Sequence, residues 1–217
     1  MPAADPSNPP FGADTDAVRA AKGVLRAQLR AARTVAEPES ATAARLARAL
    51  QLCAGNQVIA LYASADHEPD TWGLLDELHA AGHTVLLPML GRRPDGTVRR
   101  EPDWATFTGR DRLRIGYADI PEPAGPSLGA QALSRASLIW CAGLAATPSG
   151  DRLGTGGGWY DRALRFAAPD ALIGVLLRDA EVLPALPVES FDRPVGVVVT
   201  EARVLWTARN GESMPGR

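Results

Sequence analysis

A glycine-rich segment near residue 155 carries the side chains of this sequence that are best suited to chemistry. Five glycines stand there beside two arginines and two aspartates, in the order Gly150-Asp151-Arg152-Leu153-Gly154-Thr155-Gly156-Gly157-Gly158-Trp159-Tyr160-Asp161-Arg162. Glycine allows positive φ and a close approach of a ligand, so successive N–H groups can line an anion-binding concavity. A helix start favours negative charge, and arginine binds phosphate through two parallel hydrogen bonds. We therefore predict an anion site; the alternative is a plain connection between a strand and a helix.

This segment is neither of the two familiar phosphate motifs. A P-loop places a lysine directly after its glycines, and no lysine follows Gly158. The dinucleotide fingerprint belongs to the first strand–helix turn of a domain, whereas these glycines lie beyond residue 149. We therefore expect a less common phosphate-binding loop.

The elements that must position this loop alternate along the chain. Apolar runs of strand length cover residues 58–62, 84–88, 138–141, 172–176 and 195–199, and helical patterns cover 14–33, 40–53, 71–80 and 159–167. Strands that are apolar throughout and alternate with helices form a mostly parallel sheet with both faces covered. We expect a single three-layer α/β/α, Rossmann-like domain over residues 14–207.

Three segments fall outside this alternation. Residues 1–13 are rich in Pro, Ala and Asn and are predicted to be a disordered tail, and residues 208–217 a flexible one. Residues 91–126 are rich in Gly, Pro and Arg, which predicts an irregular or β-ribbon insertion with a short strand at 97–100.

The first predicted helix carries a basic stripe. Lys22, Arg26, Arg30 and Arg33 are spaced so that they share one helix face. We expect Arg30 and Arg33 to be solvated. A solvated face for all four is the alternative, because charge runs on helices are usually exposed.

Composition excludes several classes of protein. Of 217 residues, 46% are hydrophobic and 22% charged, and a net charge of −2 offers no basic field for nucleic acid or anionic membrane. Two cysteines exclude a disulfide scaffold, and the three histidines lack metal-ligand spacing. The sequence shows no signal peptide or spanning segment. We expect a cytoplasmic monomer that has small-molecule ligands and no nucleic-acid or membrane partner.

Shorter elements accompany the glycine-rich segment before and after it. They are Lys22-Gly23-Val24-Leu25-Arg26, Tyr62-Ala63-Ser64 with Glu68 and Thr71, Leu87-Pro88, Ile120-Pro121-Glu122-Pro123, Leu183-Pro184, Glu189, Asp192 and Thr200-Glu201. In this order, and over most of residues 19–204, they resemble the 5-formyltetrahydrofolate cyclo-ligase (5,10-methenyltetrahydrofolate synthetase) family. Residues 150–162 are similar to its signature G-x-R-L-G-x-G-x-G-Y-Y-D-R, apart from one aromatic exchange.

The resemblance implies an ATP- and Mg²⁺-dependent enzyme that converts 5-formyltetrahydrofolate to 5,10-methenyltetrahydrofolate. The formyl oxygen is phosphorylated, N10 attacks the activated carbon, and phosphate leaves as the ring closes. Phosphoryl transfer needs positioning and charge neutralisation rather than a protein nucleophile. The absence of a visible Ser-His-Asp or Cys-His arrangement in the sequence agrees with this expectation.

The resemblance also implies which residues bind each ligand. ATP is assigned to Lys22, Arg26, Gly150, Arg152, Leu153, Gly154, Thr155, Gly156, Gly157, Gly158 and Trp159. The folate is assigned to Ala63, Glu68, Gly156 and Tyr160, with Glu68 bonding the donor-rich pterin. Magnesium is assigned to Asp161 and Asp192, and the catalytic roles to Arg152 and Tyr160. Trp104 is considered as a pocket wall.

Plainer roles stand beside these assignments. Glu68 could be a solvated loop residue, Asp161 a carboxylate that stabilises a helix start, and Asp192 a turn residue before Pro194. Trp159 and Tyr160, which could stack on a ring, could also be core residues.

The sequence departs from the family pattern at a few positions. Ala146-Thr147 stands where Phe-Asp is common, and the other departures are Ala142 for Pro, Trp159 for Tyr, Phe191 for His and Gly196 for Asp. These changes concern the folate side and the surroundings of magnesium more than the phosphate loop. We therefore keep two alternatives to the enzyme. One is a folate- or nucleotide-binding protein of the same fold without turnover. The other, disfavoured by the lack of an obvious base, is a sugar-phosphate isomerase or acyl-transfer enzyme.

Overall fold

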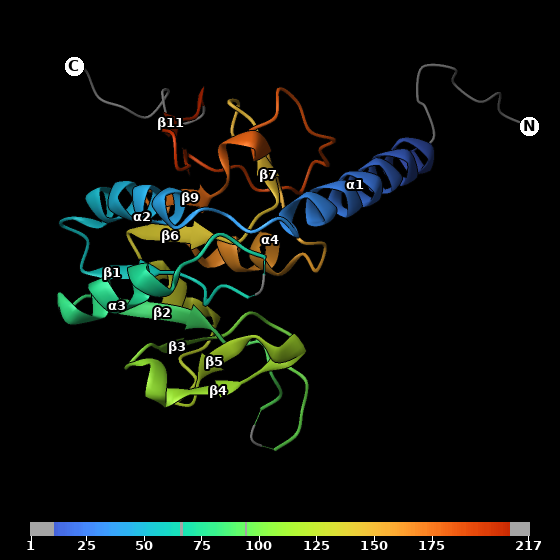
Figure 1. Cartoon of the computed structure of the whole chain (residues 1–217). Helices are drawn as coiled ribbons and strands as arrows, with labels where there is room; N and C mark the ends of the chain where they lie inside the picture. Colours follow the sequence, from blue (N-terminus) through green and yellow to red (C-terminus); the bar gives the residue numbers. More distant parts are fainter. Residues whose placement is uncertain (1–10, 66, 94, 209–217) are drawn as a thin grey trace, which may run out of the picture.

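The computed structural model describes residues 11–65, 67–93 and 95–208 (Figure 1). Its centre is a seven-stranded sheet in the order β11-β10-β9-β6-β1-β2-β3. The five inner strands are parallel: β1 (Val58–Ala60), β2 (Thr84–Pro88), β6 (Leu138–Cys141), β9 (Leu172–Leu176) and β10 (Val197–Val199). The two edges are antiparallel, β3 (Trp104–Thr106) against β2 and β11 (Val204–Trp206) against β10. The predicted mostly parallel α/β sheet is confirmed.

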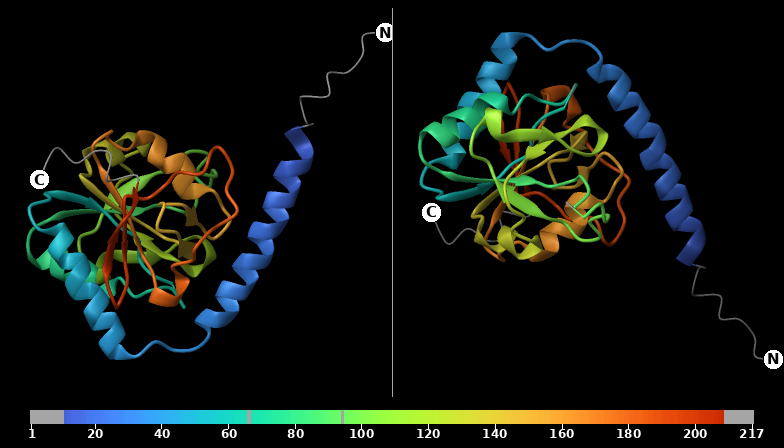
Figure 2. Two further views of the ribbon diagram at one scale, coloured as in Figure 1. Left: turned by 90° about the horizontal axis from the view of Figure 1, so that it is seen from above. Right: turned by 90° about the horizontal axis from the view of Figure 1, so that it is seen from below.

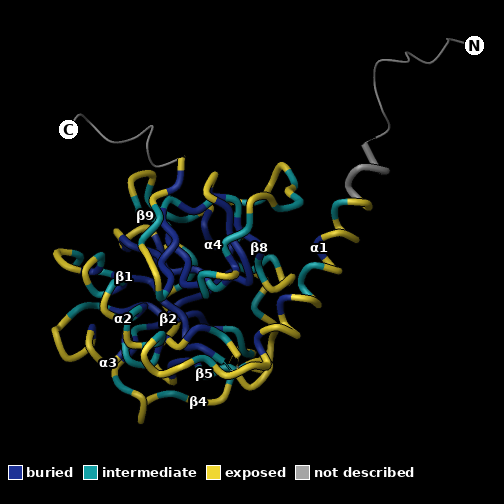
Figure 3. Tube along the Cα trace, turned by 45° about the horizontal axis from the view of Figure 1, so that its top comes forward, coloured by how far each residue is buried: buried dark blue, intermediate teal, exposed yellow. Residues whose placement is uncertain are grey.

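Helices cover both faces of this sheet. On one face lie α2 (Glu39–Cys53) and α3 (Trp72–Ala80), and on the other lie α4 (Trp159–Ala163) with the 3-10 turns η3 (Ala130–Arg135) and η4 (Leu164–Phe166). Alternating strand residues point to opposite faces, so Ile59 packs beneath α2 and α3 while Ala60 packs toward η3 and α4. Figure 3 shows the buried core along the strands. The three predicted layers are present.

Several predicted elements differ from the structure in their extent, and one does not form. The strand expected at 58–62 ends at Ala60, and the one at 195–199 begins at Val197. The helix expected at 159–167 is shorter, because α4 passes into η4 after Ala163. No strand forms at 97–100; the ribbon of the insertion is instead β4 (Leu113–Ile115) paired with β5 (Pro121–Pro123). The remaining short elements are η1 (Arg110–Arg112), η2 (Tyr117–Asp119), β7 (Ala145–Ala146), β8 (Arg152–Leu153) and η5 (Asp179–Glu181).

Helix α1 (Phe11–Arg33) runs along the side of the domain, and its first half projects outward (Figures 1 and 2). It begins within the segment predicted to be a disordered tail; residues 1–10 and 209–217 lie outside the described residues. Arg33 is buried, and its guanidinium bonds both carboxylate oxygens of Glu181 at 2.6 and 2.8 Å and the Gly143 carbonyl. The prediction that Arg33 is solvated is therefore wrong, because its partners come from segments distant in sequence. Within the part of the chain described, no helix is long and apolar enough to cross a membrane.

A close approach between neighbouring strands generates the first prediction. A Cβ at Gly174 in β9 would lie 2.5 Å from Cζ3 of the fully buried Trp140 and 2.9 Å from Cγ1 of Val197. We expect Gly174→Ala to lower the free energy of unfolding by about 1–3 kcal/mol through overpacking. Gly23→Ala, at an open position of α1, is the control and should raise it by about 0.5–1 kcal/mol through helix propensity. Urea titrations measure both; equal stabilities of Gly174→Ala and the wild type would contradict this packing.

Candidate functional site

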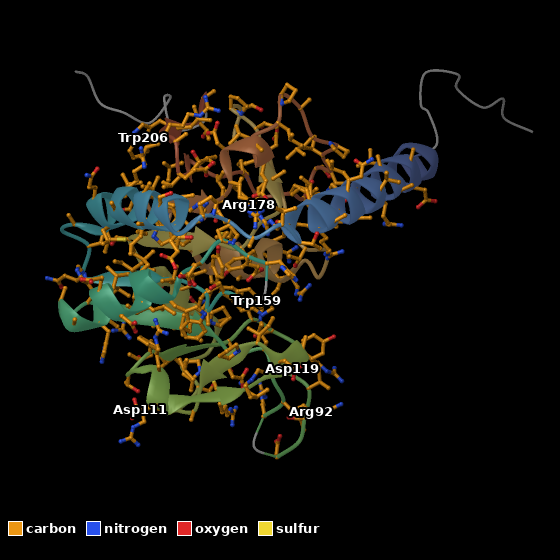
Figure 4. All side chains as sticks on the ribbon, viewed as in Figure 1. Arg92, Asp111, Asp119, Trp159, Arg178 and Trp206 are labelled. Atoms are coloured by element: carbon orange, nitrogen blue, oxygen red, sulfur yellow. The ribbon has the colours of Figure 1, made fainter. Side chains whose placement is uncertain are left out.

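A cleft of about 330 Å³ opens where the inner strands end. Tyr62 and Ala63 follow β1, Leu90 follows β2 and Ala142 follows β6, and all four line the cleft. Ligands of open α/β sheets bind at this edge, where the carboxyl ends of parallel strands meet. Helix α1, the glycine-rich loop, the β4–β5 ribbon and residues 189–192 supply the other walls. In Figure 4, Trp159 lies between the central sheet and the ribbon.

The structure brings every predicted site residue except Gly150 to this cleft. Gly150 lies in the turn between β7 and β8 with φ of +98°, and a Cβ there would come within 2.6 Å of the Val195 carbonyl oxygen. Its own carbonyl accepts a 2.8 Å hydrogen bond from the N–H of Val195. Gly150 is therefore needed for the turn that leads into Arg152. It does not line the cleft, so its predicted contact with ATP is not supported.

The loop that follows β8 is held by arginines, which donate to its backbone carbonyls. Arg26 Nε donates to the Gly154 carbonyl at 2.9 Å, Arg30 to the Thr155 carbonyl at 2.6 Å, and Arg162 to the Gly157 carbonyl at 3.1 Å. Arg30 is exposed, as expected, and it also contacts the loop. Positive φ at Gly156 and Gly158 turns the chain.

The amides of this loop are free. Among the described residues, none accepts a hydrogen bond from the backbone N–H groups of residues 155–158. Because a peptide C=O and the N–H that follows it point in opposite directions, carbonyls turned toward arginines leave the next amides turned away from them. Free neighbouring N–H groups are what an anion needs. Helix α4 is only five residues long, so an anion bound here would be held by the amides of the loop rather than by a helix dipole.

Two of the three predicted phosphate-binding cations, Lys22 and Arg152, are each paired with a predicted metal carboxylate. Lys22, only 4% exposed, donates to Glu189 at 2.8 Å and to Asp192 at 2.5 Å, and the Phe191 ring lies 5.8 Å from its Nζ. Arg152 donates to Asp161 at 2.9 Å and to the Ala142 carbonyl at 3.1 Å. Buried charges are tolerated when they are paired in this way. The cleft therefore keeps cations and carboxylates together in a balanced arrangement.

The carboxylates of the cleft suit a cation that arrives with its own ligands. Within the described ranges, no group of three or more His, Cys, Asp or Glu side chains forms a metal cluster. Magnesium binds through one or two carboxylates together with phosphate oxygens and water, so Asp161 and Asp192 fit it. Two buried atoms beside the cleft, Glu189 Oε1 and Arg152 Nε, also lack a hydrogen-bond partner among the residues described. A hydrated cation and a phosphate oxygen are groups that could complete them.

Glu68, Tyr62 and Tyr160 also line the cleft, and the Tyr160 ring lies 5.8 Å from Cζ of Arg152. The N–H of Ala65 donates to Glu68 at 3.0 Å, but burial, the larger effect, raises the pKa of the Glu68 carboxyl above its usual value. Burial also raises the pKa of Tyr160 well above its usual value, so its hydroxyl stays neutral and can donate but not act as a base. That hydroxyl lies 3.5 Å from the Trp140 carbonyl, a long contact.

Trp159 lines the cleft, and its ring packs edge to face against those of Trp104 and Tyr160, each at a centroid distance of 5.0 Å. Trp104 is fully buried and does not line the cleft, so it supports Trp159 rather than walling the pocket as predicted. Of the departures from the family pattern, Ala146, Thr147 and Gly196 also lie outside the lining, whereas Ala142, Trp159 and Phe191 are in it.

Sequence reasoning missed one whole wall of the cleft. It is apolar and consists of Pro88, Leu90, Ile120 and Pro121. A signal was present, because Pro88 ends a predicted strand, Leu90 follows it, and Ile120 and Pro121 stand in one of the short elements. Glu189, which holds Lys22, was noted only as an element of the family pattern.

Comparisons with known proteins give a consistent result. Residues 18–201 match the model of the 5-formyltetrahydrofolate cyclo-ligase family. A 5-formyltetrahydrofolate cyclo-ligase of Mycolicibacterium smegmatis is 32% identical over 147 residues, which are 68% of this chain and 75% of the relative. One of Escherichia coli is 31% identical over 147 residues, 67% of this chain and 79% of the relative.

Solved structures agree. The NMR structure of Aquifex aeolicus 5,10-methenyltetrahydrofolate synthetase has a TM-score of 0.70 at 25% identity, covering 90% of this chain and 94% of its own. A 5,10-methenyltetrahydrofolate synthetase from Mycoplasma pneumoniae, 14% identical, has the same fold with a TM-score of 0.62 over 83% of this chain and 98% of its own.

The raised pKa of Glu68 generates a prediction on stability. Because burial disfavours its charged form, the folded protein binds the Glu68 proton more tightly than the unfolded chain does. The folded state therefore loses stability as the pH rises from below the usual pKa of 4.5 through the raised value, and does not regain it above. Glu68→Gln, which has no carboxyl to ionise, should be more stable than the wild type at pH 7, with a difference that shrinks toward pH 4. Urea unfolding across this range measures it, and a difference independent of pH would refute it.

Proposed function

The chain belongs to the 5-formyltetrahydrofolate cyclo-ligase family, ligases of folate and one-carbon metabolism, and we propose that it closes the 5,10-methenyl ring in this cleft with ATP and Mg²⁺. The observation that carries the proposal is the row of free N–H groups at residues 155–158, in the same cleft as Lys22, Arg26 and Arg152. A triphosphate is the ligand whose spread of negative charge matches this row of donors.

At the phosphate end, the paired cations would change partners. Lys22 and Arg152 would turn from Asp192 and Asp161 to phosphate oxygens, and the two carboxylates would then be free for the metal. Magnesium held there would neutralise charge on the phosphoryl group in transfer. Glu189 can keep its 2.8 Å bond to Lys22 throughout, because the ammonium has three donors.

At the folate end, Glu68 would accept hydrogen bonds from the N–H donors of the pterin. Trp159 and the apolar wall would enclose the flat ring, and Tyr160 would contribute a neutral hydroxyl. Gly156, where a side chain is absent, lets both substrates come close to the backbone. Phosphorylation turns the formyl oxygen into a good leaving group, and N10 then attacks the same carbon. The protein therefore positions the reactants and excludes water rather than forming a covalent intermediate.

The alternative, a binding protein without turnover, would have less need for carboxylates beside its phosphate site. Asp161 and Asp192 in the cleft therefore favour the enzyme. The two cysteines, Cys53 and Cys141, are free and buried, which supports a reducing cytoplasm as its location. The monomeric state and the lack of a nucleic-acid partner stay predictions.

A direct assay tests the proposed function. Purified protein with 5-formyltetrahydrofolate, ATP and Mg²⁺ should form the methenyl product, followed by its near-ultraviolet absorbance. Omission of ATP or chelation of Mg²⁺ should abolish product formation. Folate binding without any product under these conditions would instead establish the binding protein.

Arg152 tests the phosphate end. Arg152→Ala removes charge-assisted hydrogen bonds, each worth about 1.5–3 kcal/mol, so the Kd for ATP should rise about 10- to 100-fold. Arg165→Ala, which removes an exposed arginine outside the cleft, is the matched control and should leave the Kd unchanged. Calorimetry with a non-hydrolysable ATP analogue measures both. Wild-type affinity in folded Arg152→Ala would show that Arg152 does not bind the nucleotide.

A further inference from the structure

The apolar wall of the cleft is assembled from two segments that are distant in the sequence. Pro88 and Leu90 stand at the end of β2, whereas Ile120 and Pro121 belong to the turn and first residue of β5 in the ribbon. In Figure 1 the ribbon lies beside the β2–β3 edge of the sheet. The shape of the wall therefore depends on what joins the ribbon to the end of β2.

One buried carboxylate connects the ribbon to the end of β2, and we call this connection the joint. Glu122, in the middle of β5, is 1% exposed and does not line the cleft. Its Oε2 accepts hydrogen bonds from the N–H groups of both Leu90 and Gly91, each at 2.7 Å. Its Oε1 accepts two from Arg114, on the paired strand β4, at 3.0 and 2.8 Å. The carboxylate thus connects both strands of the ribbon to the backbone that carries Leu90.

Two glycines leave room for this carboxylate. A Cβ at Gly91 would lie 2.8 Å from Glu122 Oε1, and a Cβ at Gly116 would lie 2.8 Å from Cδ and Oε2. Neither glycine has a positive φ, so backbone conformation does not require glycine at either position. These two positions need glycine because a larger side chain would clash with the Glu122 carboxylate.

The buried charge of Glu122 resists any movement of the ribbon relative to the end of β2. A carboxylate withdrawn from water is stable only when its oxygens are paired, and loss of a partner leaves an unsatisfied buried charge. Movement of the ribbon away from Leu90 would break two charge-assisted hydrogen bonds together. The end of β2 and the ribbon are therefore held in one relative position.

We propose that Glu122 is a positioning residue for the folate: it fixes the Leu90 and Ile120–Pro121 wall without touching the substrate. Its interactions reach the cleft through the backbone of Leu90 on one side and through Pro121, its neighbour in β5, on the other. The identity of the ligand at this wall rests on the proposed function; the joint itself does not.

Two variants of different chemistry disturb the joint. Glu122→Gln places an amide NH₂ against donors, and Gly91→Ala displaces the carboxylate without changing any charge. We expect the KM for 5-formyltetrahydrofolate to rise about tenfold in Glu122→Gln, which corresponds to one charge-assisted hydrogen bond, while kcat and the KM for ATP change less than about twofold. Gly91→Ala should move the folate KM in the same direction.

Two controls separate positioning from general stability. Gly125→Ala makes the same chemical change just after the ribbon, where no atom lies within 4 Å of the new Cβ, and should leave every constant unchanged. Glu37→Gln removes the charge that pairs with the buried Arg45, away from the cleft, and should lower the melting temperature without affecting the folate KM.

Hydrogen exchange tests the joint independently of catalysis. The amide hydrogen of Leu90 should exchange faster in Glu122→Gln and Gly91→Ala than in the wild type and in Gly125→Ala. If the wild type forms no methenyl product, the proposed function fails while this measurement still decides the joint. If the wild type turns over and folded Gly91→Ala and Glu122→Gln keep its folate KM, only the role of Glu122 is overturned. Should Glu122→Gln not fold, Gly91→Ala decides.

Discussion

The site depends on a balance of charge between α1 and the segments that face it. An anion site must hold several cations close together before its ligand arrives, and unpaired buried cations would repel one another. Here Lys22 is neutralised by Glu189 and Asp192, and Arg152 by Asp161. These pairs fasten α1, the glycine loop and residues 189–192 around one cleft. In the proposed function, the same carboxylates would hold the metal that accompanies ATP, so one set of residues would serve the protein both with and without nucleotide.

At the proposed folate end, buried carboxylates also need partners, but Glu122 and Glu68 differ in how many they have. Glu122 is paired on both oxygens, so it stabilises a wall and does not react, whereas Glu68 has one backbone donor and is otherwise desolvated. A carboxylate with capacity left over can accept the donors of a ligand. At the phosphate end, Arg152 Nε and Glu189 Oε1 are likewise buried without a hydrogen-bond partner among the described residues.

Much of the fold and part of the site could be predicted because they depend on neighbours in sequence. Local sequence patterns were enough to predict the strands β1, β2, β6 and β9, which are apolar runs, and the loop of glycines after Arg152. Edge strands β3 and β11 were not predicted, because their apolar runs are at most three residues long, whereas the equally short β1 lies in the longer apolar run of residues 58–62. Arg33 was taken for a solvated residue, although Glu181 lies opposite it in the fold. Nothing near Arg33 in the sequence indicates that partner.

The sequence by itself determined the class of fold, since this follows from short-range pattern and residue type, and it predicted that the glycine-rich loop is an anion site. Only the tertiary structure decided which charges meet. It paired Lys22 with Glu189 and Asp192, bonded Glu122 to the backbone N–H of Leu90, and left Gly150 and Trp104 out of the lining of the cleft. The physical reason is that a charge or a hydrogen-bonding group is satisfied by whatever the folded chain brings within about 3 Å, and that partner can lie anywhere in the sequence.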